Sequence, residues 1–538
     1  KTYSGYPSLR KGSIMSRIRK VAFAGLLILP LVAGGFVLQH KTDREGARLF
    51  DRVFGLVSAR FVDTLGTDEL YARAARGLLS ELDDPYAALV SPKEMEEFTV
   101  ETAGRYGGIG LLIEDHEGKF TVNRVFPNTP GEQAGVQPGD LVMAIDGKFT
   151  HGWEFGNVTG ALKGEPGTKV VVDFARPGVA QPVQAKLTRA VIRIPSVPYA
   201  MMLDHKTGYI PLQQFSENST IELQSAVRRL QSEGMESLVL DFRGNGGGYT
   251  DQALAIANFF LPRGAEIYSV RTRDSVPERY YASRNPIAPD LPLIVLTDGY
   301  SASATEIVAG ALQDHDRALV LGTTSFGKGL VQTVYPLEDG WVVKMTTGKW
   351  FTPSGRSIQR PDRDVGAARQ QVPDSVEGPV DSLAERPSFR SDAGRVVYGG
   401  GAITPDVIVK YDTMSTVEST LAKAIAPKSQ DAYLALYELA LDLKSKVRPD
   451  FQVTQQERDD LYRRLQARGV AIDRAQYDAG QRYIDRLIGN KVATMAFGDS
   501  TAKRRAVPDD PQLRRALELI QQGRTQKDLL ALASSNRG

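Results

Sequence analysis

The 538-residue sequence contains no cysteine, only three tryptophans and only five histidines. Without cysteine there is no disulfide framework and no thiolate metal site. Neither charge predominates, since 66 lysines and arginines stand against 64 aspartates and glutamates, for a net charge of +2. No basic stripe with interleaved aromatic residues is present, so nothing argues for nucleic-acid binding. An apolar content of 42% and a charged content of 24% are those of ordinary globular protein.

Charge is one-sided near the N-terminus. No acidic residue precedes Asp43, and a basic cluster stands before the uncharged run Val21–Leu38. These eighteen residues are at the short end of what spans a bilayer, and basic residues before them predict that the remainder is exported. An uncleaved anchor and a cleaved signal segment, with Val32-Ala33-Gly34 as its site, both fit the pattern. Met15 stands just before the basic cluster, which favours it as the start residue.

One stretch in the middle of the chain predicts a strand, a helix, a second strand and a glycine-punctuated loop. Leu291–Thr297 and Ala318–Leu321 are short apolar runs typical of buried strands. Ala304–Gln313 is rich in helix formers and has one apolar face. This βαβ unit brings Ser303 and Lys328 to neighbouring strand ends, which is where ligands bind in open α/β sheets.

Three interpretations of Ser303 and Lys328 compete. In the simplest, Ser303 caps the helix and Lys328 is a solvated loop lysine, as most such residues are. A phosphate-binding loop is the second, because Gly322–Lys328 nearly spells one, but Gly329 stands where Ser or Thr must bind Mg²⁺ and a strand pattern follows. The third is a serine nucleophile with a lysine base. Because the ordinary pKa of lysine is about 10.4, a neutral amine near pH 7 costs about 4 kcal/mol, which burial can supply.

Histidine is the usual base, and its positions in this chain do not suit the role. The five are His40, His116, His151, His205 and His315. His315 follows Ser303 by 12 residues on the same predicted helix, about 18 Å along its axis. The other four lie in distant or weakly patterned segments. Asp314-His315-Asp316 has its side chains pointing in different directions on a helix, so we expect a solvated helix end and not a metal site.

These motifs resemble those of the C-terminal processing peptidases, also called tail-specific proteases. The matching residues are Ser301-Ala-Ser-Ala-Thr-Glu306 and Phe326-Gly-Lys-Gly-Leu-Val-Gln332, with the family's spacing of 25 residues between serine and lysine. The resemblance implies that Ser303 is the nucleophile, Lys328 the general base and Gln332 the residue that orients the lysine. Glu306 falls where some members carry a glutamate near the site.

A glycine-rich turn, Arg243-Gly-Asn-Gly-Gly-Gly248, follows the predicted strand Ser237–Phe242. A dinucleotide fingerprint would need glycine at Tyr249, so that interpretation fails. The resemblance implies that the turn supplies oxyanion-hole donors, because backbone N–H groups can meet the negative charge of acyl transfer. We assign the N–H groups of Gly247 and Ala304, with the glycines on either side of Gly247 as alternatives.

The segment from residue 104 to 190 resembles the family's PDZ domain. Tyr106-Gly-Gly-Ile-Gly-Leu111 contains glycines that let backbone N–H groups converge on an anion. We expect this loop to hold the substrate's C-terminal carboxylate through Gly108, Ile109, Gly110 and Leu111, with Ile109 and Leu111 lining an apolar groove mouth. Lys163 stands where some members carry an arginine that links the PDZ domain to the active site.

The sequence therefore predicts a mixed α+β protein. An α/β protease core with βαβ units, of the ClpP/crotonase-like type that the resemblance implies, carries an inserted β-rich PDZ domain and a helical C-terminal region. The expected divisions are 1–43 for the tail and apolar segment, 44–103 for an N-terminal helical segment, 104–190 for the PDZ domain, 191–425 for the core and 426–538 for the helical region. Apolar stripes within residues 44–82 predict core packing.

The predicted function is that of a serine endopeptidase of the bacterial cell envelope, anchored in the membrane or exported to its extracytoplasmic side. It recognises free C-termini of protein substrates with apolar tails and needs no metal, nucleotide or other cofactor. For the helical C-terminal region, covering the core, forming a homo-oligomer and binding a regulatory adaptor all remain open. A PDZ scaffold with a degenerate protease core is the binding-only alternative, and the intact Ser303, Lys328 and Gln332 argue against it.

Overall fold

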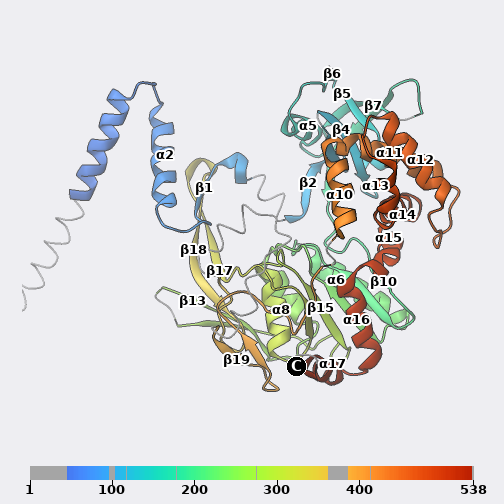
Figure 1. Ribbon diagram of the computed structural model, residues 1–538. Coiled ribbons are helices and arrows are strands. Elements are labelled where there is room, and N and C mark those ends of the chain that lie inside the picture. Colours follow the sequence, from blue (N-terminus) through green and yellow to red (C-terminus); the bar gives the residue numbers. More distant parts are fainter. Residues whose placement is uncertain are drawn as a thin grey trace, which may run out of the picture. The chain divides into compact units, whose positions relative to one another are not determined.

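The computed structural model describes residues 45–95, 103–116, 118–176, 178–273, 276–360, 386–411 and 414–535 (Figure 1). The chain forms two compact units, Lys1–Leu89 and Val90–Gly538. In the first, residues 45–60 and α2 (Thr67–Ser80) are helices. Leu49 and Leu78 are 66% and 69% exposed, so most of the predicted apolar stripes do not form a core within this unit. The apolar run 21–38 lies outside the described residues, and no helix within them is long and apolar enough to cross a bilayer.

The predicted PDZ region is an antiparallel sheet with the order β3-β4-β5-β7-β8, in which β6 pairs with β5. Its elements are β3 (Leu111–His116), β4 (Lys119–Val125), α4 (Pro130–Gln133), β5 (Leu141–Ile145), β6 (Lys148–Phe149), α5 (Phe155–Leu162), β7 (Lys169–Ala175) and β8 (Val183–Thr188). Every second residue of β7 is buried, as expected for a strand with one face on a core. β2 (Arg105–Gly108) and β9 (Ala190–Arg193) pair where the chain enters and leaves this region.

The predicted protease core is built on a sheet with the order β10-β11-β12-β15-β16-β21, which is parallel except for β10 against β11. The strands are β10 (Met201–Met202), β11 (Thr207–Pro211), β12 (Ser237–Asp241), β15 (Leu293–Thr297), β16 (Leu319–Gly322) and β21 (Val407–Ile408). Every residue of β12, β15 and β16 is buried, as in parallel sheets covered on both faces. Because these strands are parallel, the segments that follow them meet at one edge.

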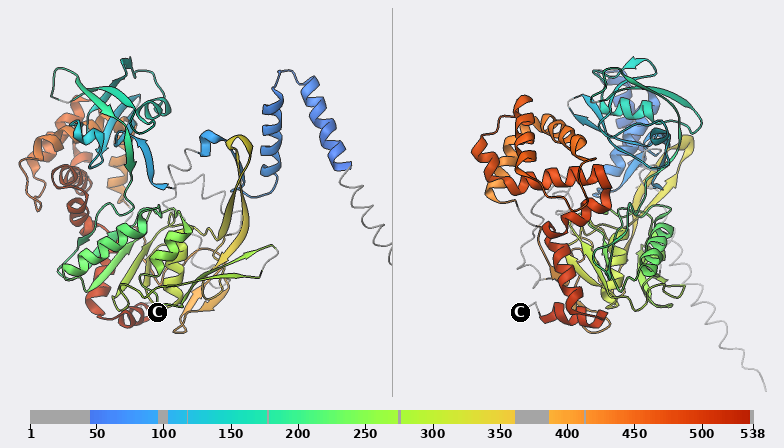
Figure 2. Two further views of the ribbon diagram at one scale, coloured as in Figure 1. Left: turned by 180° about the vertical axis from the view of Figure 1, so that it is seen from behind. Right: turned by 90° about the vertical axis from the view of Figure 1, so that its right-hand side faces the viewer.

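Helices cover both faces of this sheet. On one face, α6 (Ser219–Ser232), α7 (Thr250–Ala257) and α8 (Ala304–Asp314) share a core with Leu240 and Val295. On the other, α16 (Pro511–Gln522) and α17 (Gln526–Ser535) pack leucines and alanines against the next residues along the same strands (Figure 2). These last two helices belong to the predicted C-terminal region, so part of that region completes the protease core.

A second, antiparallel sheet is formed by strands that alternate along the chain with those of the parallel sheet. It joins β13 (Glu266–Thr272), β14 (Glu278–Tyr281), β17 (Leu330–Pro336) and β18 (Val342–Phe351), with the turn η1 (Glu338–Gly340) between the last two. β19 (Ser388–Arg390) and β20 (Val396–Tyr398) form a separate pair, and β1 (Ala88–Val90) is a short strand near the N-terminus. The loop that carries Lys328 therefore leaves the parallel sheet at β16 and enters the antiparallel sheet at β17.

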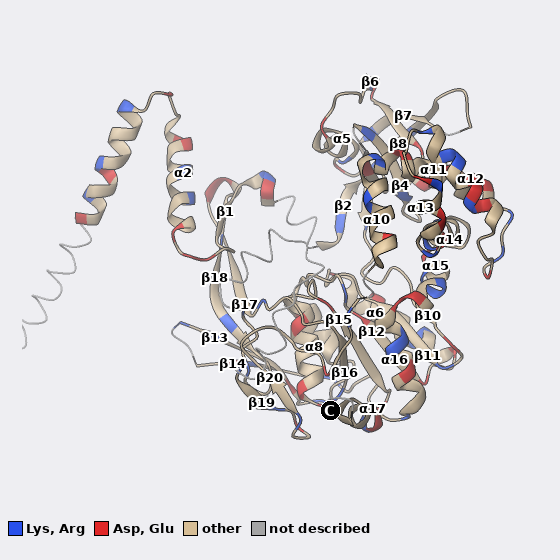
Figure 3. Cartoon of the chain, viewed as in Figure 1, with Lys and Arg blue, Asp and Glu red and all other residues tan. Residues whose placement is uncertain are grey.

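The remaining helices have a core of their own. They are α10 (Thr416–Ile425), η3 (Ala426–Lys428), α11 (Ser429–Leu443), α12 (Gln455–Ala467), α13 (Arg474–Ala479), α14 (Gln481–Phe497), α15 (Asp499–Ala506) and η4 (Val507–Asp509). Figure 3 shows both charges along α12, whereas β15 and β16 carry none. This region contacts the PDZ region closely, because a Cβ added to Gly139 would lie 1.9 Å from the ring of Tyr437. The mixed α/β architecture predicted from the sequence is confirmed.

Candidate active site

Ser303 stands between β15 and α8 in a strained backbone conformation. Its φ of 57° and ψ of −116° lie outside the regions that non-glycine residues normally adopt, at a cost of order 1–3 kcal/mol. An ordinary helix cap has φ and ψ in the β region instead. The N–H of Ser303 donates to Glu306 Oε2 at 2.9 Å, which helps to hold this conformation. Ser303 and Glu306 form the capping box of α8, so the serine does cap the helix, and its strained backbone distinguishes it from an ordinary cap.

Glu306, one turn into α8, joins the serine segment to the lysine loop. Its side chain is fully buried. Oε2 accepts the N–H groups of Ser303 and Lys328, each at 2.9 Å, and Oε1 accepts the Ser325 hydroxyl at 2.5 Å and the Gly327 N–H at 2.7 Å. A carboxylate has about four acceptor positions, so the capacity of Glu306 is filled by these two segments.

The shared oxygen of Glu306 limits the distance between the two predicted catalytic residues. Because Oε2 lies 2.9 Å from the nitrogen of Ser303 and 2.9 Å from that of Lys328, the two nitrogens are at most 5.8 Å apart. The Phe326 N–H donates to the Ser301 carbonyl at 3.0 Å and attaches the loop a second time. The fold thus brings together two residues that are 25 positions apart in the sequence.

The burial of Glu306 has an electrostatic cost. Removal from water raises the pKa of the Glu306 carboxyl above its ordinary 4.5, and the hydrogen bonds from Ser325, Lys328, Ser303 and Gly327 oppose that shift. A buried charge that loses its donors is strongly destabilising. Keeping Glu306 inside the protein therefore requires that both attached segments stay in place.

Asn245 fixes the glycine turn against the serine segment. Its side chain is fully buried, and its backbone carbonyl accepts the Ala302 N–H and the Thr305 hydroxyl, both at 3.0 Å. Its Oδ1 accepts the N–H of Gly247 at 2.9 Å. The turn is consequently attached to the residues on both sides of Ser303.

Gly247 lies directly beside Ser303, with a φ of 98°. A Cβ added there would lie 2.6 Å from the Ala302 carbonyl oxygen and 3.0 Å from Ser303 Cβ, so only glycine fits. The N–H of Ala304, at the start of α8, has no acceptor among the described residues, and its role as an oxyanion-hole donor stays a prediction. The N–H of Gly247 is occupied by Asn245, so its predicted role requires that this donor turn to the substrate.

Gln332 lies on β17, where the pairing with β18 shifts register between Val331 and Gln332. Its side-chain Nε2 is buried and has no hydrogen-bond partner within the described part of the chain. A buried donor without a partner costs about 1–3 kcal/mol. The amide is therefore available to another group, and its predicted role in orienting Lys328 stays a prediction.

Sequence reasoning missed a buried charged network beneath the glycine turn. Arg243 lies between two carboxylates, with Nη2 2.6 Å from Asp241 Oδ2 and 2.9 Å from Asp510 Oδ2. Lys503 donates to Asp510 at 2.9 Å. Burial raises the pKa of the Asp510 carboxyl, but hydrogen bonds and charge from Arg243 outweigh it, so the pKa is well below its usual range. Asp510 is 267 residues from Arg243, and no local pattern marks such a contact.

The predicted carboxylate loop of the PDZ region has its side chains turned inward. Ile109 and Leu111 are 2% and 9% exposed and pack in the core of this region, so the expectation that they line an open groove mouth is wrong. Lys163, at the end of α5, places Nζ 5.7 Å from the centre of the Tyr106 ring, which precedes the loop. The backbone role of Gly108, Ile109, Gly110 and Leu111 stays a prediction.

The cluster Asp314-His315-Asp316 is not the solvated helix end that the sequence indicates. Asp314 is 1% exposed and pairs with the fully buried Arg356 at 2.7 Å, and Asp316 pairs with Arg395. His315 Nδ1 lies 2.7 Å from Asp392 Oδ2. These partners follow much later in the chain, so the expectation is wrong. Among the described residues, no group of three or more His, Cys, Asp and Glu side chains has the geometry of a metal site.

Comparison with known proteins places the chain among processing proteases. Residues 206–365 match the model of peptidase family S41, and residues 121–176 match a PDZ domain. The carboxy-terminal-processing protease of Bartonella bacilliformis is 35% identical over 68% of this chain and 87% of its own length. The carboxyl-terminal-processing protease of Synechocystis is 33% identical over 59% of this chain and 73% of its own. A solved structure named photosystem II D1 C-terminal processing protease is 31% identical over 56% of this chain and 82% of its own, with a TM-score of 0.36.

The family models and the curated relatives define a serine-type peptidase that carries a PDZ domain. The first relative is sufficiently similar, and covered over enough of its length, to settle the family. The chain belongs to the carboxy-terminal processing proteases of peptidase family S41. The resemblance drawn from the residues around Ser303 and Lys328 is thereby confirmed.

Proposed function

We propose that the protein is a serine endopeptidase that captures free C-termini of protein substrates in its PDZ domain and cleaves near them with Ser303 and Lys328. The observation that carries this proposal is the shared Glu306 oxygen, which limits the separation of the two backbone nitrogens to 5.8 Å. A lysine side chain extends about as far, so its amine can reach the serine hydroxyl.

In the proposed reaction, Ser303 Oγ attacks the scissile carbonyl while the neutral Lys328 amine takes its proton. The protonated amine then gives that proton to the leaving amine, and water hydrolyses the acyl-enzyme. Gln332 orients the lysine. The N–H groups of Ala304 and Gly247 stabilise the oxyanion, and one such donor is worth about 10²–10³ in rate.

The PDZ contribution rests on an open sheet edge. β3, which follows the loop Gly108–Leu111, pairs with β4 on one side and ends the described sheet on the other. An extended peptide can add to such an edge by β-augmentation, with its terminal carboxylate received by the loop N–H groups. Apolar substrate tails remain an expectation from the family.

The test measures cleavage of an unstructured substrate that ends in an apolar tail. Ser303→Ala and Lys328→Ala are each expected to abolish turnover. Ser225→Ala on the exposed side of α6 and Lys206→Ala, whose side chain is 66% exposed, are the matched controls and should cleave normally. Turnover that survives either active-site change removes the mechanism. Equal cleavage of a C-terminally amidated substrate removes the PDZ capture step.

We further propose that residues 21–38 direct the enzyme to the extracytoplasmic side of a bacterial envelope, as an anchor or a cleaved signal. The one-sided charge before this run supports that orientation. Alkaline phosphatase fused after Asp43 should be active in cells and lose activity when residues 15–40 are deleted, because it folds only outside the cytoplasm. Activity that is independent of the segment would remove this proposal. The division of the chain at 44–103, 104–190, 191–425 and 426–538 is likewise proposed, and limited proteolysis between these segments tests it.

A further inference from the structure

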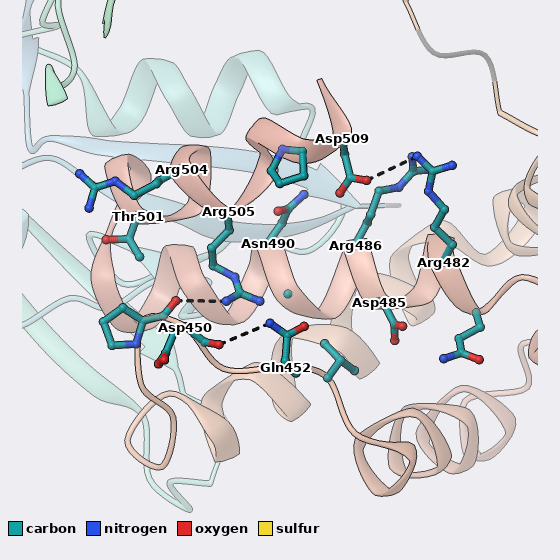
Figure 4. A pocket seen from close by; sticks show the side chains of 15 residues that line it. Asp450, Gln452, Arg482, Asp485, Arg486, Asn490, Thr501, Arg504, Arg505 and Asp509 are labelled. Atoms are coloured by element: carbon teal, nitrogen blue, oxygen red, sulfur yellow. Dashed lines mark hydrogen bonds and ion pairs between the residues drawn. The ribbon is translucent and has the colours of Figure 1, made fainter. Parts of the chain in front are cut away.

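A cavity of about 1000 Å³ opens in the helical C-terminal region, away from the residues that surround Ser303 (Figure 4). It is bounded by the loop from Pro449 to Val453, one face of α14, one face of α15 and the turn η4. On α14 the lining residues recur every four positions, which makes one continuous wall along the helix. A cavity of this size accommodates a ligand of several residues.

The wall of the cavity is polar and carries more basic than acidic groups. Four arginines and three aspartates line it: Arg482, Arg486, Arg504, Arg505, Asp450, Asp485 and Asp509. Two aspartates are already engaged, since Asp485 pairs with Arg458 from outside the cavity at 2.8 Å and Asp509 pairs with Arg482 at 3.4 Å. Two arginines are engaged as well, because Arg482 is the partner of Asp509 and Arg486 pairs with Glu418 at 3.2 Å. Two arginines, Arg504 and Arg505, and one aspartate, Asp450, line the cavity without an ion-pair partner among the described residues.

Arg505 is the best-defined of these cations. Its Nη1 donates to the Pro449 carbonyl at 3.1 Å, and its guanidinium stacks 4.1 Å from the centre of the Phe451 ring. A Cβ added to Gly489 would lie 3.6 Å from Nη2, at ordinary contact distance, so the guanidinium lies close to α14 at this glycine. Within the described chain Arg505 has no carboxylate at ion-pair distance. Burial lowers the pKa of Arg505, and the negative charge of Asp450 opposes that shift. A guanidinium in a protein is always charged.

The cavity lining combines arginines with aspartates and amide side chains, which favours some anionic ligands over others. Arg505 is fixed in place with donors to spare, and Figure 4 shows it beside Asp450 and Gln452. A single-stranded nucleic acid would find no aromatic side chain in the lining on which to stack its bases. A peptide can place Asp or Glu against the arginines and present backbone amides to Asn490 and Gln452.

We propose that this cavity binds an extended, acidic peptide segment of another protein, with a carboxylate of that segment paired to Arg505. The site is separate from the catalytic residues, and the inference does not depend on the roles proposed for Ser303 and Lys328. It gives the helical region a partner-binding role in addition to its packing on the core.

Binding is measured on the full chain by fluorescence anisotropy with a labelled decapeptide of alternating Glu and Ser. The peptide ends in an amide, which removes the terminal carboxylate that the PDZ loop would recognise. Matched Gln-Ser and Lys-Ser peptides and a single-stranded DNA oligomer are the comparison ligands, and mass spectrometry confirms that the probe is intact. The acidic peptide is expected to bind more tightly than all three. Equal binding of the Glu and Gln peptides, tighter binding of DNA, or no saturation up to about 1 mM would overturn the proposal.

Two variants locate the binding. Arg505→Gln removes the paired cation and should weaken binding of the acidic peptide about tenfold. Asn490→Asp changes an exposed residue in the wall without altering its size, so it leaves the fold intact and should also weaken binding by repulsion. Arg463→Gln, 73% exposed on α12 and outside the cavity, makes the same charge change as the first variant and should have little effect. If Arg463→Gln matches Arg505→Gln, or if Asn490→Asp binds normally, the cavity is not the site.

Discussion

Replacing Glu306 by glutamine keeps the shape of the side chain and removes its charge. One carboxylate oxygen becomes an NH₂ group, which donates and cannot accept. The amide will turn its NH₂ toward Ser325, because that hydroxyl can rotate and accept a hydrogen bond. The Gly327 N–H, now 2.7 Å from a donor position, then loses its acceptor. Ser303 and Lys328 keep their bonds at 2.9 Å, but to a neutral oxygen.

The magnitude follows from these changes. A lost bond to a charged group costs about 1.5–3 kcal/mol, and the weakening of the others adds about 2 kcal/mol. Because burial of the Glu306 charge is itself unfavourable, removing the charge offsets part of this loss of stability. We expect a net loss of about 3 kcal/mol in the free energy of unfolding. A shift of about 1 Å between Ser303 and Lys328 should also lower kcat about 100-fold with little change in KM.

Urea unfolding and steady-state cleavage of one peptide measure the two effects. Glu233→Gln is the matched control, since Glu233 caps the C-terminus of α6, is 42% exposed and pairs among the described residues with Arg229 of that helix. It should change the unfolding free energy by less than about 0.5 kcal/mol and leave kcat intact. If Glu306→Gln unfolds at the wild-type urea concentration and retains full kcat, the carboxylate does not hold the serine and lysine segments together.

Three further changes have defined outcomes. Gly247→Ala should lower kcat about 10²–10³-fold, because the added Cβ would lie 2.6 Å from the Ala302 carbonyl oxygen. Gly246→Ala, whose Cβ would have no atom within 4 Å, should keep a kcat near that of the wild type. Equal kcat values for the two variants would contradict the assigned oxyanion position. Asp510→Asn should cost about 3 kcal/mol of unfolding free energy at pH 7. The folded state lowers the pKa of Asp510, so the stabilisation from its charge is present above the ordinary value of about 3.9 and is lost as pH falls through the folded-state value. The difference in unfolding free energy between wild type and Asp510→Asn, measured in urea, should therefore shrink below about pH 4. A difference that does not change with pH would mean that the charge is not its cause. Gly110→Ala, whose Cβ would lie 2.3 Å from Thr129, should raise KM several-fold for a substrate with a free C-terminus and leave an amidated one unchanged.

The elements around the site could be predicted from the sequence because their patterns are strong and local. The runs 291–297 and 318–321 correspond to β15 and β16, and the helix expected over 304–313 is α8 with one more residue. Apolar runs of this length, bounded by turn residues, are typical of strands in a sheet that is covered on both faces. Ser303 and Lys328 could be named because their motifs lie at the ends of these elements.

What the sequence could not supply are contacts between charged residues far apart along the chain. Asp314 is indistinguishable in sequence from a solvated aspartate at a helix end, because its partner Arg356 is 42 residues later. Asp510 sits in a helical region with no motif, yet it contacts Arg243 beneath the glycine turn. The burial of Ile109 could not be predicted either, because an apolar residue beside glycines is equally typical of a binding groove and of a core.

Buried polar groups hold the segments of the candidate active site in place. The segments after β12, β15 and β16 must leave the sheet edge open to a substrate, so apolar packing cannot cover them from above. They are held from below by buried polar groups instead: Asn245 for the glycine turn, Asp298 for the turn before Ser303, and Glu306 for the lysine loop. Asp298 also accepts the Gly244 N–H at 3.1 Å, which links two of these segments directly. Hydrogen bonds of this kind are directional, and an unsatisfied buried partner is costly. The arrangement therefore fixes the backbone around Ser303, which is half-buried at this edge.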